Sequence, residues 1–139
     1  MSEPDKVVNL RGRFVGIAVL TGIQAINGII HAFFGSVLLL GNYVPFASPS
    51  NAPLIFSFYT LSYGLLTIFF TYLFWKGNRL GWIGTIAVSL FVIIADSLTV
   101  LDLLTLLGII KTAAIGEIPY SLLIIFYLLQ NHVRLKYGI

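Results

Sequence analysis

The chain has 139 residues and a formal net charge of +3; 58% of its residues are hydrophobic and 9% are charged. Soluble globular domains are about a quarter charged, so this composition excludes an ordinary soluble fold and is typical of an integral membrane protein. The length predicts a single domain over residues 1–139. The absence of cysteine excludes disulfides, iron–sulfur clusters and thiolate metal sites, and we expect no cofactor.

The N-terminal half predicts two membrane-spanning helices. No Asp, Glu, Lys or Arg lies between Arg13 and Lys76, a run of 62 residues. About 20 apolar residues cross one hydrocarbon core, so this run predicts helices over 14–40 and 54–75. The segment 41–53 holds three of the five prolines and predicts a loop.

The C-terminal half predicts two further helices. A tight turn at 76–79 leads into a helix over 80–96, and segment 97–110 either continues this helix or lies along the membrane interface. We expect a break or bend between Asp96 and Asp102. A loop at 111–116 then precedes a fourth helix over 118–136, because Pro119 suits a first turn and Glu117 suits a helix N-terminus.

The basic residues predict how the helices are oriented. Seven of the eight Lys and Arg residues lie at one side of the predicted bundle: Lys6, Arg11, Arg13, Lys76, Arg79, Arg134 and Lys136. Lys111 alone lies at the other side. Because basic residues are enriched on the cytoplasmic side, both termini are predicted to be cytoplasmic. The fold class is therefore predicted to be all-α: an integral membrane four-helix bundle, multi-pass in the plasma membrane.

Two of the predicted helices carry stripes of small and polar residues at spacings of three and four, which place them on one helix face. The stripe of the first helix contains Gln24, Asn27, Gly28 and Gly35, and the stripe of the second contains Ser57, Thr60, Gly64, Thr67 and Thr71. Such stripes bring membrane helices close together, and this is the expected role. The alternative is a polar path for water, protons or a small solute.

His31 and Asp96 form a candidate intramembrane polar pair. Each lies 16 or 17 residues from the predicted cytoplasmic end of its helix, so the two have matched depth, roughly 25 Å from the inner boundary. Because an ionised carboxylate at the bilayer centre costs about 2.5–3.5 kcal/mol, Asp96 needs a partner, a cavity or the outer headgroups. It is therefore an interfacial capping residue, a hydrogen-bond partner of His31 or Asn27, or a proton- or metal-binding group.

The sequence contains no catalytic, cofactor-binding or metal-binding signature. His31 and His132 fall at opposite ends of the predicted bundle, so they cannot ligate one haem within a single chain. The basic residues sit at helix ends and form no stripe for nucleic acid, so no nucleic-acid partner is expected.

Short motifs at the predicted helix ends resemble those of a known family. They are Arg13-Phe14-Val15-Gly16-Ile17 before the first helix, Trp75-Lys-Gly-Asn-Arg-Leu-Gly-Trp82 at the turn, and Tyr127-Leu-Leu-Gln-Asn-His-Val-Arg-Leu-Lys-Tyr-Gly138 at the end. Together they resemble an uncharacterised family of small four-span membrane proteins of archaea and bacteria, although that family has Pro where this chain has Phe14. The resemblance implies the four-helix architecture and no particular activity.

The expected function is that of a non-catalytic accessory or scaffolding subunit, which packs against other membrane helices in a larger complex. The expected partners are the lipid bilayer and other membrane subunits or further copies of the chain. The alternative is a small oligomeric transporter or channel with a polar path along the first two helices. A membrane enzyme is the third hypothesis.

The predicted orientation has a direct test, because the chain has no cysteine of its own. In intact cells, Ser48→Cys should react with a membrane-impermeant thiol reagent, and Asn78→Cys should react only after the cells are permeabilised. Labelling with the opposite pattern would overturn the predicted topology.

Overall fold

The computed structural model of the protein describes residues 3–43, 53–103 and 111–139. In these residues all of the regular structure is helical: α1 (Glu3–Tyr43), α2 (Leu54–Trp75), α3 (Arg79–Val100), α4 (Lys111–Leu128) and α5 (Asn131–Lys136). Ser48, most of the predicted loop 41–53 and residues 104–110 of segment 97–110 lie outside the described residues.

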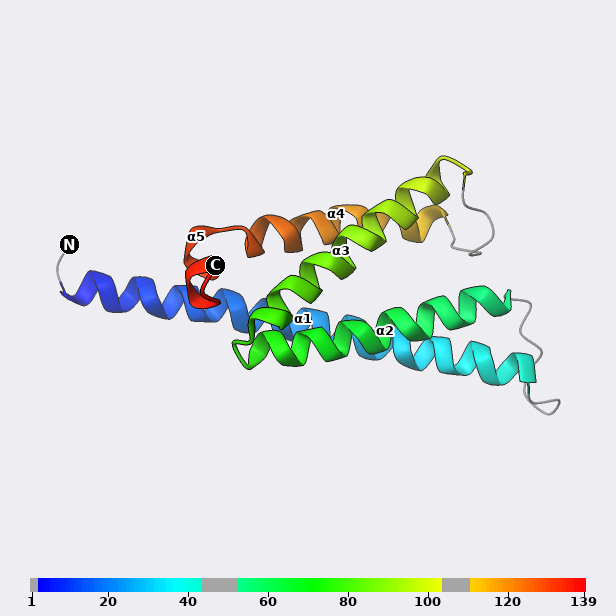
Figure 1. The fold of residues 1–139 in the computed structure, drawn as a ribbon, viewed down its shortest axis with the longest axis horizontal. Coiled ribbons are helices and arrows are strands. Elements are labelled where there is room, and N and C mark those ends of the chain that lie inside the picture. The colour runs from blue at the N-terminus through cyan, green and yellow to red at the C-terminus, as the bar shows by residue number, and fades with distance from the viewer. Residues whose placement is uncertain (1–2, 44–52, 104–110) are drawn as a thin grey trace.

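The four long helices form two hairpins that are joined at one end (Figure 1). α1 lies beside α2 over most of the length of α2, and α3 packs against both α2 and α4. We call the end with the α2–α3 turn and α5 the proximal end. The distal end is the one where α1 and α3 end and α2 and α4 begin.

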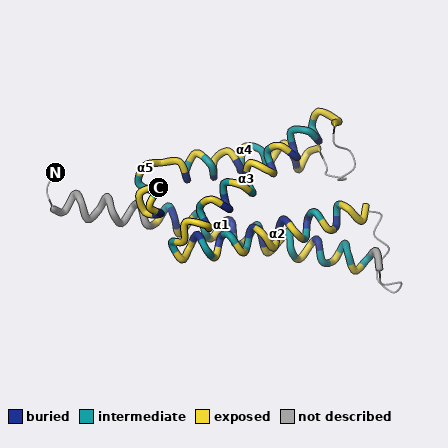
Figure 2. Tube along the Cα trace, viewed as in Figure 1, coloured by how far each residue is buried: buried dark blue, intermediate teal, exposed yellow. Residues whose placement is uncertain are grey.

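Four of the described helices are long and apolar enough to cross a membrane, over Val15–Gly41, Leu54–Trp75, Arg79–Val100 and Lys111–Leu128. The predicted all-helical class with four apolar helices is therefore confirmed. The burial pattern suits a hydrocarbon solvent, because large apolar side chains such as Phe33 (71% exposed) and Phe126 (67%) point outward. Figure 2 shows the buried residues along the inner faces of the helices.

α1 is longer than the predicted helix over 14–40. It contains 41 residues, so its length is about 60 Å at 1.5 Å per residue. The added N-terminal part is polar, and its only proline, Pro4, lies in the first turn, where proline is compatible with a helix. The end at Tyr43 differs from the prediction by three residues.

The predicted limits of the fourth helix are wrong at both ends. Residues 111–116 are helical rather than a loop, and Pro119 lies inside α4 instead of in its first turn. The helix ends at Leu128, whose carbonyl accepts a hydrogen bond from the Trp82 indole Nε1 at 3.0 Å. This bond satisfies one of the carbonyl groups that a helix C-terminus leaves free. The chain then turns at Gln130 into the short α5.

The two predicted interruptions around α3 are present. Gly77 has a φ of 75°, and Asn78 caps α3 by accepting a hydrogen bond from Leu80 N at 2.9 Å. At its other end α3 stops at Val100, and Asp102 follows with a φ of 61°. This left-handed conformation is tolerated by Asp and ends the helix within the expected interval.

The proximal end holds the apolar core of the described residues. Its buried members are Ile17, Phe74, Ile124, Leu128, Val133 and Tyr137. The Tyr137 ring stacks on Phe74 with 4.8 Å between centroids, and its hydroxyl donates to the Phe74 carbonyl at 2.7 Å. Burial raises the pKa of the Tyr137 hydroxyl, which keeps the donor protonated. The C-terminus is thereby fixed to the end of α2.

Glycines bring the backbones of α1 and α2 into contact. A Cβ atom added to Gly64 would meet the backbone nitrogen of Ala32 and would lie 2.8 Å from the Gly28 carbonyl oxygen. A Cβ added to Gly35 would lie 2.6 Å from Leu61 Cα. Real Cβ atoms do not approach backbone this closely, so larger residues at these positions would force the two helices apart.

Gly64→Leu should therefore destabilise the protein by about 1–3 kcal/mol through overpacking of the α1–α2 contact. Thermal unfolding in detergent measures the effect. Phe69→Leu is the matched control, because Phe69 lies on the same helix, is 54% exposed and should tolerate the change. An unchanged melting temperature for Gly64→Leu would mean that the contact between these helices does not limit stability.

Candidate functional site

Polar side chains fill much of the interior between the four long helices. The buried polar residues of the described chain are Gln24, Ser57, Thr60, Thr67, Thr71, Thr85, Ser89, Asp96, Thr99 and Ser121. Each of α1, α2, α3 and α4 contributes to this set. A membrane bundle that only packs its helices needs small residues at contacts, but it does not need a buried carboxylate. The polar interior is therefore the candidate site.

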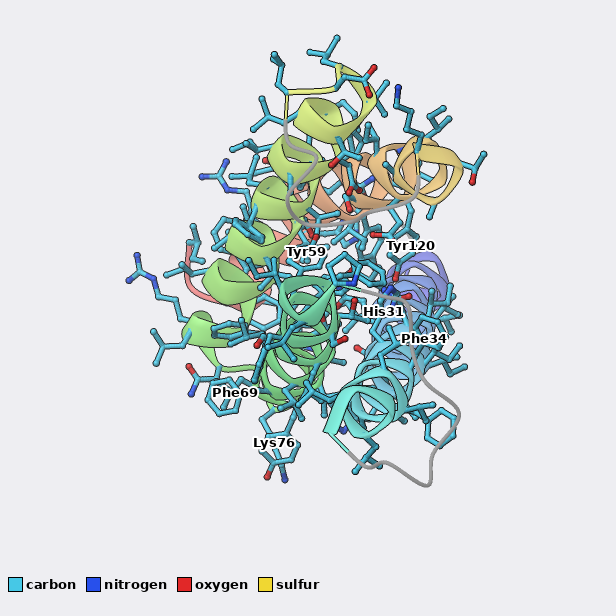
Figure 3. The ribbon with its side chains drawn as sticks, turned by 90° about the vertical axis from the view of Figure 1, so that its right-hand side faces the viewer. His31, Phe34, Tyr59, Phe69, Lys76 and Tyr120 are labelled. Carbon is cyan, nitrogen blue, oxygen red and sulfur yellow. The ribbon has the colours of Figure 1, made fainter. Side chains whose placement is uncertain are left out.

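The larger of two polar-lined spaces lies toward the distal end, and we call it the distal chamber. Its volume is about 170 Å³. The polar groups that line it are His31, Tyr59, Thr60, Tyr63, Asp96 and Glu117, together with the rings of Phe34 and Phe56. Figure 3 shows His31, Tyr59 and Tyr120 between the helices, whereas Phe69 and Lys76 lie on the outside.

His31 bonds to two groups in the chamber. Its Nδ1 lies 2.9 Å from the Asn27 carbonyl oxygen, which can only accept, so Nδ1 carries a hydrogen. Its Nε2 lies 3.3 Å from Glu117 Oε1. With Nδ1 protonated, this bond forms either between an imidazolium and a carboxylate or between a neutral imidazole and a protonated Glu117. In both states the pair shares one acidic proton and has no net charge.

Asp96 is the buried carboxylate of the chamber. It is 1% exposed and lies inside α3, about one turn before the end of the helix. Neither of its oxygens has a hydrogen-bond partner among the described residues. Burying an ionised carboxylate without a partner costs several kcal/mol even after the protein relaxes around it, which is more than the cost for an unpaired neutral polar group. A proton, a water molecule or a cation beside Asp96 would lower this cost.

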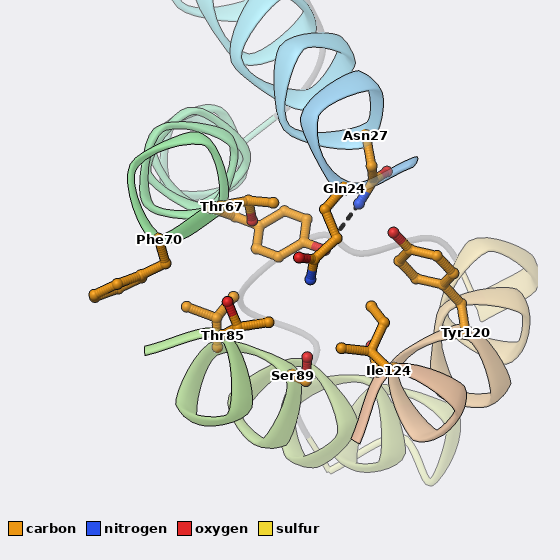
Figure 4. A pocket seen from close by; sticks show the side chains of 11 residues that line it. Gln24, Asn27, Thr67, Phe70, Thr85, Ser89, Tyr120 and Ile124 are labelled. Atoms are coloured by element: carbon orange, nitrogen blue, oxygen red, sulfur yellow. Dashed lines mark hydrogen bonds between the residues drawn. The ribbon is translucent and has the colours of Figure 1, made fainter. Parts of the chain in front are cut away.

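The smaller space lies deeper in the bundle, and we call it the central cavity (Figure 4). Its volume is about 10 Å³, close to the ~10–15 Å³ that a single water molecule requires. Asn27 Nδ2 donates to the Tyr63 hydroxyl at 3.1 Å, and Tyr63 lines both spaces. Gln24 Oε1, Thr85 Oγ1 and the Tyr120 hydroxyl are buried without partners in the described part of the chain. Polar groups therefore continue from the chamber into the bundle.

The residues of the two predicted stripes divide between two roles. Gly28, Gly35 and Gly64 make the close contact between α1 and α2. The other members are polar: Gln24 and Asn27 line the central cavity, Thr60 lines the chamber, Thr67 lines the central cavity, and Ser57 and Thr71 are buried on α2. Packing and a polar interior are thus both present on the same helices.

The structure places His31 and Asp96 in the same chamber, but it corrects the predicted partner of the imidazole. His31 bonds to Glu117 and not directly to Asp96. The sequence predicts Glu117 at a helix N-terminus, because the predicted fourth helix begins at residue 118. With α4 beginning at Lys111, Glu117 lies one turn before the buried Ser121 and faces the interior. Its spacing from Ala114, Ser121 and Ile124 was the available signal.

The chain matches no protein-family model, no curated protein and no solved structure. What the described residues define is an all-helical fold with four helices that are long and apolar enough to cross a membrane. Within the described residues, no group of three His, Asp or Glu side chains could hold a metal ion.

The contacts of His31 predict unequal energetic coupling to the two carboxyl groups. A double-mutant cycle with His31→Leu and Glu117→Gln should give a coupling of roughly 0.5–3 kcal/mol, because the two side chains share a hydrogen bond. The cycle with His31→Leu and Asp96→Asn should give a smaller coupling. Chemical unfolding in detergent measures both. A larger coupling to Asp96 would show that the pairing seen here is not the dominant one.

Proposed function

We propose that this protein is a small transporter of the plasma membrane, which binds a small polar solute in the distal chamber. The observation that supports the proposal best is Asp96, a carboxylate that is 1% exposed, lies within an apolar bundle and has no partner in the described chain. Intramembrane ionisable residues are costly and are usually found on substrate, ion or proton pathways.

The arrangement of the chamber suits binding and release of a solute. All four long helices line it, since it includes His31 from α1, Thr60 from α2, Asp96 from α3 and Glu117 from α4. A change in the relative position of the two hairpins would therefore change every wall of the site. The polar side chains around the central cavity would continue the path of polar groups from the chamber toward the proximal end.

The orientation belongs to the same proposal. Lys76, Arg79, Arg134 and Lys136 lie at the proximal end of the described structure, whereas Lys111 lies at the distal end. Under the positive-inside rule the proximal end and both termini are cytoplasmic. The chamber then opens in the outer half of the membrane.

An accessory or scaffolding subunit of a larger membrane complex is the second candidate function. The specific observation that favours it is the exposed surface of α1. Only 17% of the apolar 18-residue stretch of α1 is buried, against 39% of the corresponding stretch of α3. Partner helices or further copies of the chain would cover this face. Purification in native detergent with mass spectrometry tests it, because an accessory subunit should co-purify with stoichiometric partners.

Water access to the chamber separates the two functions. Thr60→Cys places a thiol in the chamber at a position that is 3% exposed, and Leu65→Cys places one on the outer face of the same helix, where the residue is 55% exposed. In proteoliposomes a small hydrophilic thiol reagent should modify the first and leave the second unmodified. The reason is that a thiol must ionise to react, which hydrocarbon prevents and a hydrated chamber allows.

Equal and negligible reactivity of the two thiols would mean that the chamber is a dry packing interface. That result would remove the support for transport and leave the accessory-subunit function. Modification of Thr60→Cys with no co-purifying partner would support transport.

A further inference from the structure

We infer that the distal chamber binds a small organic ammonium ion, with Asp96 as its counter-ion and aromatic rings as its walls. The inference rests on the proposed function, because it names the class of solute that the chamber takes.

The charges around the chamber favour a cation. His31 and Glu117 share one proton and contribute no net charge, as their hydrogen-bond geometry requires. Lys111, at the same end of the bundle, is bound to Asp102 at 2.6 Å, and both of these side chains are exposed. No Lys or Arg lines the chamber in the described chain. With Asp96 deprotonated, the titratable groups that line the chamber therefore have a net charge of −1, which a bound cation would balance.

The aromatic walls favour an organic cation over a metal ion. Phe34 from α1 and Phe56, Tyr59 and Tyr63 from α2 line the same space as Asp96. Tyr59 and Tyr63 are stacked with 6.4 Å between centroids, and the Tyr59 hydroxyl has no hydrogen-bond partner among the described residues. Aromatic rings attract ammonium groups that lie over their faces, and cages of such rings recognise quaternary ammonium ions. Metal ions instead require several convergent oxygen or nitrogen ligands.

The volume limits the size of the ligand. The chamber has about 170 Å³, below the ~300–1,000 Å³ of pockets for drug-sized ligands. It therefore fits an ammonium ion with a few small substituents and not an extended lipid or peptide. One carboxylate, aromatic contact and a small volume together define the ligand class.

Choline and 3,3-dimethyl-1-butanol test the inference, because they have the same shape and only choline carries a charge. Equilibrium dialysis of radiolabelled choline against the purified protein in nanodiscs should show saturable binding. The neutral isostere at the same concentration should not compete. Both measurements use the unmodified chain, so they do not depend on whether any variant folds.

Substitutions then locate the binding site. Asp96→Asn should weaken choline binding at least about 30-fold, since loss of one partner of a buried charge pair costs about 2–5 kcal/mol. Asp102→Asn is the matched control, because Asp102 lies just beyond α3 and outside the chamber, and it should leave the affinity unchanged. Tyr59→Leu should weaken binding roughly 2–30-fold and Tyr59→Phe less, because phenylalanine keeps the ring.

Three results would overturn the inference: no saturable binding of choline, equal competition by the neutral isostere, or unchanged binding in a folded Asp96→Asn variant. Each is distinguishable from failure of the proposed function. If Thr60→Cys is modified by the hydrophilic reagent while choline does not bind, the chamber is hydrated and the solute belongs to another class. If Thr60→Cys is not modified, the transport proposal itself fails.

Discussion

The close contact between α1 and α2 is the interaction on which the rest of the structure depends. Gly28, Gly35 and Gly64 let the two backbones meet without intervening side chains. In a bilayer, where lipid is as apolar as leucine, such packing is a main source of helix association. The contact also sets the rotation of both helices. It turns Asn27 and His31 of α1 toward Tyr63 of α2, and the polar interior begins at this point.

The described residues satisfy only part of the polar interior. His31 of α1 bonds to the Asn27 carbonyl and to Glu117. On α3 the polar atoms of Thr85 and Asp96 are buried without partners in the described chain. An unsatisfied buried group keeps its desolvation cost, typically about 1–3 kcal/mol, until water or a ligand bonds to it. Unpartnered buried groups also lie on the other three long helices of the described chain, and they include Gln24 on α1, Tyr59 on α2 and Tyr120 on α4.

The sequence predicts the limits of some helices better than those of others. α2 was predicted at its observed limits, because charged residues, glycine and proline mark its two ends. α4 was not, because Pro119 suits a first turn and carries no signal that the helix begins two turns earlier. Because the predicted helix begins too late, Glu117 falls outside it, and the sequence does not predict that its side chain points into the bundle. The matched depth of His31 and Asp96 along their helices correctly predicts that they lie near each other. Depth alone does not show in which direction each side chain points around its helix axis. The partner of His31 therefore required the structure.

The attachment of the C-terminus has a mechanical consequence. Tyr137 bonds to the end of α2, so a hydrogen bond and an apolar core join the two hairpins at the proximal end. The bond from the Trp82 indole to Leu128 joins α3 to α4 within the second hairpin. Toward the distal end of the described residues, the hydrogen bond of His31 to Glu117 joins α1 to α4. The exposed ion pair of Lys111 and Asp102 lies within the second hairpin, and such pairs contribute at most about 1 kcal/mol. Any rotation of one hairpin against the other about the proximal core would have its largest displacement at the distal end, and it would have to stretch or break the His31–Glu117 bond.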